Sequence, residues 1–197
     1  MQGKIRTFIA IELDSHILKV IASYTARLQA RFPSGFRWVK SELMHLTIKF
    51  LGDVDFKHVD QISQRLDRVC SSTSSFPLKI SGTGAFPSWR NPRTVWIGLK
   101  KSQSLLDFHN RIESELVELG IPIENRHFSA HLTLCRVSDY VDPVQVHQLE
   151  NLLSSTPLAE DLSWLVNEVT LFRSILKPGG PVYSALSNHA LERSAKV

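Results

Sequence analysis

Two stretches of this chain decide its fold: MHLTIKF, residues 44–50, and AHLTLCR, residues 130–136. Each holds a His-Leu-Thr core, and the two histidines, His45 and His131, are separated by 131 − 45 = 86 positions. Apolar and β-branched residues dominate both stretches, which is typical of a buried or half-buried strand. Because side chains alternate across a strand, we expect each histidine and the threonine two residues on to share one face. Two imidazoles and two hydroxyls could then converge at one site.

The similarity between the two stretches continues beyond the motifs. Asp55 follows the first motif and Asp142 the second, an offset of 87, and both precede apolar residues at helical spacing. The aligned apolar positions are Val59, Ile62 and Leu66 in the first copy and Val146, Leu149 and Leu153 in the second. The pattern predicts a duplicated strand-turn-helix unit. Two copies are too few for a solenoid, so we expect two lobes related by a pseudo-twofold axis, with the site between them.

Composition agrees with one two-lobed domain over residues 1–197. A chain of this length can bury about 70% of the surface that its unfolded form exposes. The formal net charge of +4 suits an anionic ligand. Two cysteines cannot build a disulfide framework, and no signal peptide is recognisable, so we expect a reduced, cytoplasmic protein. The apolar run at residues 8–11 is far shorter than the roughly 20 residues that span a bilayer, and no membrane partner is expected.

Strand-like and helix-like patterns alternate without a regular βαβ rhythm, which favours an α+β fold. We expect two antiparallel sheets flanked by helices, with a central cleft. Strands are predicted at residues 4–13, 36–39, 44–51, 76–81, 94–99, 128–134, 164–172 and 182–186. Helices are predicted after the capping residues Asp14, Ser102 and Asp142, and from about Asp55 to Val69. A long loop, residues 82–93, and a hairpin turn at residues 177–180 complete the prediction.

The paired motif suits displacement at phosphorus. An unperturbed histidine pKa near 6.5 allows one imidazole to be neutral while its neighbour is protonated, so a pair can supply both a general base and a general acid. One histidine would take a proton from attacking water and the other would give one to the departing oxygen. Thr47 and Thr133 could donate hydrogen bonds to the non-bridging phosphate oxygens. This chemistry requires neither a metal nor another cofactor.

Other interpretations of single residues are less favoured. A metal site at His127 and His131 would need their four-residue spacing on a helix, whereas a strand is predicted there. Cys135 would need a base directed at it to act as a nucleophile. Phe50 and Trp89 could stack on a base, or simply pack in the fold. Basic residues that could contact phosphates are Lys49, Arg90, Arg93 and Arg136, of which we favour Arg136.

In these motifs the chain resembles the two-histidine phosphoesterase superfamily, and most closely the RNA 2′,3′-cyclic phosphodiesterases once called 2′-5′ RNA ligases. The resemblance covers nearly the whole chain. Besides the two motifs, it includes RTFIAIEL (residues 6–13), FPSWRNPRTVWIGL (86–99) and LFRSILKPGGPVYSAL (171–186). The family commonly has proline before the second histidine, where this chain has Ala130.

The resemblance implies a role for each site residue. His45 would be the proton donor to the departing 3′ oxygen, and His131 would be the proton acceptor that activates water. Thr47, Thr133 and Arg136 would hold the substrate phosphate, and Phe50 matches a position where an aromatic ring can stack on the terminal base. The implied partners are RNA ends with a 2′,3′-cyclic phosphate, with tRNA fragments among the candidates, bound by a monomer. Two alternatives stay open: 2′-5′ ligation of tRNA halves, and a non-catalytic module that binds RNA ends.

Overall fold

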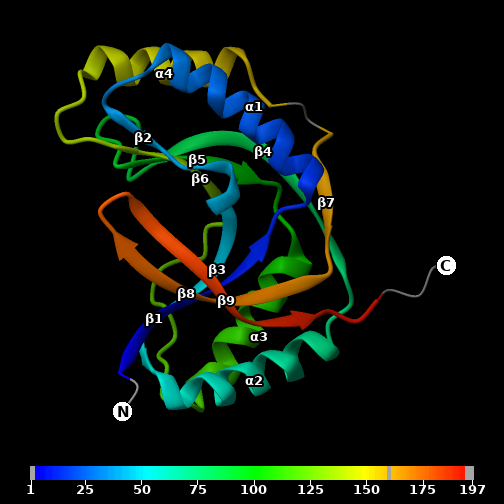
Figure 1. Cartoon of the computed structure of the whole chain (residues 1–197). Coiled ribbons are helices and arrows are strands. Elements are labelled where there is room, and N and C mark those ends of the chain that lie inside the picture. Colours follow the sequence, from blue (N-terminus) through cyan, green and yellow to red (C-terminus); the bar gives the residue numbers. More distant parts are fainter. Residues whose placement is uncertain (1–2, 159–160, 194–197) are drawn as a thin grey trace.

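The two quoted stretches form neighbouring strands at the centre of the computed structural model, which describes residues 3–158 and 161–193 (Figure 1). These residues form nine strands and four α helices. In chain order they are β1 (Lys4–Glu12), α1 (Ser15–Arg31), β2 (Phe36–Trp38), β3 (His45–Asp55), α2 (Val59–Ser71), β4 (Phe76–Phe86), β5 (Thr94–Leu99), α3 (Gln103–Val117), β6 (His131–Val137), α4 (Pro143–Ser155), β7 (Ser163–Val166), β8 (Glu168–Lys177) and β9 (Gly180–Ala190). Short 3₁₀ turns, Ser41–Leu43 and Phe56–His58, precede β3 and α2.

The predicted α+β fold with two lobes is confirmed. The strands follow the order β7-β4-β5-β6-β3-β1-β8-β9, with β2 beside β6, and neighbouring strands are antiparallel. Strands β3 and β6 meet through one residue pair, Leu46 opposite Leu132. The expected two sheets are therefore joined at this pair into one curled sheet, which we divide into an upper half (β7, β4, β5, β6, β2) and a lower half (β3, β1, β8, β9).

Two of the four helices cross from one half of the sheet to the other. Helices α1 and α4 lie together over the upper half, and α2 and α3 lie together against the lower half (Figure 1). The Tyr24 hydroxyl of α1 donates a hydrogen bond to the Thr156 carbonyl just after α4. Helix α1 follows β1 of the lower half but covers the upper half. Helix α3 follows β5 of the upper half but lies against the lower half. The duplicated units themselves, β3 with α2 and β6 with α4, each stay within one half.

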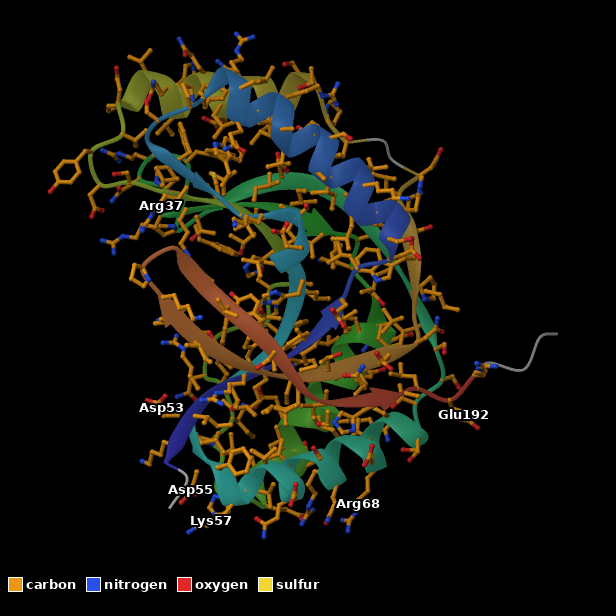
Figure 2. The ribbon with its side chains drawn as sticks, viewed as in Figure 1. Arg37, Asp53, Asp55, Lys57, Arg68 and Glu192 are labelled. Atoms are coloured by element: carbon orange, nitrogen blue, oxygen red, sulfur yellow. The ribbon has the colours of Figure 1, made fainter. Side chains whose placement is uncertain are left out.

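The local signals in the sequence start the helices where predicted. Asp14, Ser102 and Asp142 cap α1, α3 and α4 by accepting hydrogen bonds from backbone N–H groups of the first turn. Asp55 caps the 3₁₀ turn that leads into α2 in the same way (Figure 2). The aligned apolar positions of α2 and α4 are all buried: Val59, Ile62, Leu66, Val146, Leu149 and Leu153. This equivalence supports the predicted duplication.

Several predicted strand bounds are wrong, among them those of β4 and of the strand predicted at residues 164–172. Strand β4 continues to Phe86, because residues 83–86 pair with residues 94–97 of β5. The loop predicted at residues 82–93 is therefore confined to residues 87–93. The single strand predicted at residues 164–172 is two strands, since β7 pairs with β4 in the upper half while β8 pairs with β1 in the lower half. The predicted turn at residues 177–180 does join β8 to β9. None of the described helices is both long and apolar enough to cross a membrane.

Candidate active site

The pair of Leu46 and Leu132 lies on a local twofold axis between the two motifs. Because the strands are antiparallel, this register places His45 opposite Thr133 and Thr47 opposite His131. Both leucines are 0% exposed, whereas the two histidines and two threonines are half-buried. The four polar side chains therefore share the face of the strands opposite to the core, as their alternation predicts. Two histidines and two threonines are brought together around one axis.

A matching irregularity follows each motif. In β3, Ile9 and Ala10 pair with Lys49 and Thr47, leaving Ile48 without a partner. In β6, Val95 and Trp96 pair with Cys135 and Thr133, leaving Leu134 without one. An extra residue of this kind is a β-bulge, which reverses the faces of the residues that follow it. As a result Phe50 and Arg136, themselves 86 positions apart, return to the face of the histidines.

Both histidine rings are fixed by the same hydrogen bond. The Nδ1 atom of His45 lies 2.8 Å from the Leu43 carbonyl oxygen, and that of His131 lies 2.7 Å from the Ser129 carbonyl oxygen. Since a carbonyl oxygen can only accept, Nδ1 of each ring carries the proton and donates it. The Nε2 atom of each neutral ring is then left as the acceptor. A neutral ring offers a base at Nε2, and a protonated ring offers an acid at the same atom.

Aromatic side chains pack against the two imidazoles. Ring centroids of Phe8 and Tyr183 lie 4.9 and 5.4 Å from that of His45, with Tyr183 edge-on. On the other side, Phe86 and Trp96 lie 5.0 and 6.3 Å from His131. The indole of Trp96 packs directly on Gly84 of β4, where an added Cβ would lie only 2.3 Å from it. These rings hold the imidazoles in place and partly exclude water from them.

Burial and nearby charges shift the pKa of two groups at the site, His45 and Tyr183. Burial lowers the pKa of His45, and the nearby charge of His131 lowers it further, while the hydrogen bond to Leu43 acts in the opposite direction. Burial also raises the pKa of Tyr183, an effect that the positive charges of Arg136 and Arg6 reduce. Tyr183 and Arg136 thus lie on the His45 side. Tyr183 lies outside both His-Leu-Thr motifs, and the only signal for it in the sequence is its place in the C-terminal stretch that carries the family resemblance.

Lys49 is not available to bind phosphate. The bulge after Thr47 turns it inward, where it is 2% exposed and its Nζ lies 2.5 Å from Oε2 of Glu113. The ammonium also donates a hydrogen bond to the Pro122 carbonyl, and Glu113 accepts one from the Glu124 N–H. The pair therefore anchors the segment that leads from α3 to His131.

The structure argues against both rival uses of the second motif. Burial raises the pKa of Cys135 to about 12, so its thiol stays protonated and is a poor nucleophile near neutral pH. His127 lies in an irregular, exposed segment, so its four-residue spacing from His131 does not place the two imidazoles on one helix face. Across residues 3–158 and 161–193, no three His, Cys, Asp or Glu side chains gather as a candidate metal site.

The loop residues Trp89, Arg90 and Arg93 do not join the histidines. They line a cavity of about 510 Å³ together with the start of α4, including Pro143 and His147. The loop nevertheless begins directly after Phe86, which packs against His131. Of the sequence-predicted ligand residues, Phe50 and Arg136 are thus placed on the histidine face, whereas Trp89, Arg90 and Arg93 belong to a different surface.

His189 is buried and lies in a chain of hydrogen bonds between α2 and β9. Its Nδ1 lies 2.6 Å from Oδ1 of Asp67, and its Nε2 lies 2.9 Å from the Ser187 hydroxyl, which in turn lies 2.7 Å from that of Ser63. This order of groups is that of a hydrolytic triad. It spans the contact between α2 and β9, however, and neither described cavity is lined by it. We interpret it as a hydrogen-bonded link that holds α2 on the sheet.

Comparison with known proteins gives one consistent result. A family model described as "LigT like Phosphoesterase" matches the chain twice, over residues 11–96 and 97–183. The RNA 2′,3′-cyclic phosphodiesterase of Thermotoga maritima is 31% identical over 181 residues, covering 92% of this chain and 92% of that protein. A Thermus thermophilus crystal structure superposes with a TM-score of 0.80 at 25% identity, covering 95% and 98% of the two chains. Escherichia coli LigT complexed with 3′-AMP superposes with a TM-score of 0.75 at 28% identity over the same shares.

Proposed function

Because this chain belongs to the family of LigT-like phosphoesterases, we propose that it opens 2′,3′-cyclic phosphates at RNA ends by paired histidine acid-base catalysis. The observation that carries this proposal is the matched hydrogen bonding of His45 and His131 across the local twofold axis. Two imidazoles presented with the same free nitrogen are equipped to act on opposite sides of one phosphorus atom. The phosphodiesterase relatives and the 3′-AMP complex of E. coli LigT support an RNA end as the ligand.

The reaction follows from this arrangement. Nε2 of neutral His131 takes a proton from water, and the water oxygen forms a bond to phosphorus. The bond from phosphorus to the 3′ oxygen breaks on the opposite side, and Nε2 of protonated His45 gives its proton to that oxygen. The products are a 2′-phosphate and a 3′-hydroxyl. The hydroxyls of Thr47 and Thr133 donate hydrogen bonds to the non-bridging oxygens as negative charge builds on them.

The charge of the substrate prepares His45 for its role. In the free protein, burial and His131 lower the pKa of His45, which favours its neutral form. An anionic phosphate bound between the rings favours the protonated form, because an opposite charge nearby stabilises a cation. The imidazolium formed in this way can give its proton to the departing oxygen. Assignment of His45 as donor and His131 as acceptor follows the family resemblance.

The remaining residues on the histidine face complete the ligand site. Arg136 supplies a guanidinium to the phosphate, and Phe50, 61% exposed, offers a ring on which the terminal base can stack. All groups in this scheme belong to the chain itself, so we propose that no metal takes part. We further propose that the protein acts as a cytoplasmic monomer and that tRNA fragments are among its substrates.

Kinetics of histidine variants test the proposal. With a short RNA ending in a 2′,3′-cyclic phosphate, we expect His45→Ala and His131→Ala to lower kcat by roughly 10²–10⁴-fold while Kd for the substrate changes much less. His127→Ala is a matched control, since it removes an exposed histidine four residues before His131. A module that only binds RNA ends would show no turnover to lose. Equal losses of binding and turnover in the two motif variants would contradict the proposed acid-base pair.

A further inference from the structure

A pair of arginines lies beyond His45 on the same face. Strand β6 pairs with β3 only at Leu132, and farther along β6 its partner is β2. In this second pairing Arg37 of β2 lies directly opposite Arg136 of β6. Both arginines are exposed. Because directly opposed residues of antiparallel strands point to the same face, Arg37 shares the face of Arg136 and therefore of the histidines. In Figure 2, Arg37 is found on the side of the upper half that faces the hairpin of β8 and β9.

This arrangement costs stability in the free protein. Like charges directly opposite each other in a sheet are destabilising. Neither Arg37 nor Arg136 forms an ion pair with a described carboxylate. Two adjacent guanidinium groups without a counterion form a site to which a phosphate can bind through several hydrogen bonds. The pair therefore points to an anion that is absent from the free chain.

The proposed reaction indicates which anion this is. The departing 3′ oxygen lies at His45, so the ribose of the terminal nucleotide lies on that side of the phosphorus, and the RNA chain continues from its 5′ oxygen. Along β6, Arg136 is three residues beyond Thr133, the residue opposite His45, a separation of about 10 Å. The charge of Arg136 also acts on Tyr183, whose ring packs against His45. The arginine pair thus lies where the RNA chain leaves the site.

We propose that Arg37 and Arg136 bind the phosphodiester that precedes the cyclic end, which makes an RNA oligonucleotide the preferred substrate over a cyclic mononucleotide. This inference rests on the proposed function. Arg136 stands between the two phosphates and serves both. Arg37, one strand spacing of about 4.8 Å farther away, contacts only the internucleotide phosphate. A cyclic mononucleotide has no such phosphate, so Arg37 contributes nothing to its turnover.

The test compares Arg37→Ala with the unaltered protein on two substrates, adenosine 2′,3′-cyclic phosphate and a hexanucleotide with a 2′,3′-cyclic end. We expect kcat/KM to fall about tenfold on the hexanucleotide and to change less than about twofold on the mononucleotide. The slope of log(kcat/KM) against log[salt] should lose about 0.7 of its magnitude for the hexanucleotide alone. Arg68→Ala removes an exposed arginine of α2 at the far end of the molecule and should change neither value (Figure 2).

Stability measurements separate this role from a structural one. Because Arg37→Ala removes a like-charge pair, Tm should stay the same or rise slightly, whereas a residue needed for the fold would lower it. Equal losses on both substrates, or an unchanged hexanucleotide rate, would overturn the inference while leaving the proposed function intact. If the unaltered protein turns over neither substrate, the proposed function fails and the inference fails with it.

Discussion

Removing one member of the buried pair Lys49 and Glu113 should destabilise the protein severely. The two side chains are 2% and 5% exposed, and a lone charge left at this depth has lost most of its solvation. In Lys49→Met, the only hydrogen bond left to the Glu113 carboxylate is the one from the Glu124 N–H to Oε2. The other carboxylate oxygen, Oε1, lies 3.6 Å from Nε2 of His109. We expect this variant to lose about 3–5 kcal/mol of unfolding free energy. For a chain of this length, that corresponds to a fall in Tm of roughly 6–20 °C.

The double variant Lys49→Met/Glu113→Leu should recover most of this loss. Replacing both charges with apolar groups of similar volume removes the desolvation cost and is often neutral or stabilising. Urea unfolding followed by circular dichroism measures each free energy. The matched control is Lys57→Met, because Lys57 pairs with Asp55 at the surface, where such pairs contribute about 0–1 kcal/mol (Figure 2). A loss below about 1 kcal/mol for Lys49→Met, or simple additivity in the double variant, would refute the reasoning.

Three further predictions follow from the burial of single side chains. The folded protein holds the pKa of His45 below its value in the unfolded chain, so the unfolded state binds more protons as pH falls below about 6.5. The free energy of unfolding should therefore decrease below this pH, and it should decrease less in His45→Asn measured at the same pH. The thiols of Cys70 and Cys135, both with pKa raised to about 12 by burial, should react with a thiol reagent only after denaturation, and fast labelling of the native protein would contradict this. His189→Ala should lower the unfolding free energy by about 1–3 kcal/mol and leave kcat unchanged, whereas a loss of turnover at full stability would contradict a structural role.

The sequence predicted those parts of the site that depend on alternation along a strand. The four side chains share one face because each threonine, Thr47 or Thr133, lies two positions after its histidine, His45 or His131. The helix starts were also predictable, because a capping side chain acts on backbone groups within three residues of itself. The repeat of 86 positions indicated the pseudo-twofold relation, which the two consecutive family matches repeat at the same spacing, 97 − 11 = 86.

What the sequence did not predict depends on pairing between distant strands. The bulges at Ile48 and Leu134 exist because β1 and β5 skip these residues, and they decide that Phe50 turns outward while Lys49 turns inward. Without the bulge, simple alternation would have placed Lys49 with His45. The partner of Lys49, Glu113, lies 64 residues away on helix α3. The contact between Tyr183 and His45 likewise depends on β8 and β9 returning to the lower half.

Phosphorus NMR of the end group tests the central claim most directly. The protein is incubated in excess EDTA with a short RNA that ends in a 2′,3′-cyclic phosphate, and the same experiment is repeated with His131→Ala. The account predicts that the cyclic phosphate signal is replaced by that of a 2′-phosphomonoester with the unaltered protein and persists with the variant. An unchanged cyclic phosphate would contradict metal-independent catalysis by the His45 and His131 pair, and a 3′-phosphomonoester would contradict the proposed cleavage of the bond to the 3′ oxygen.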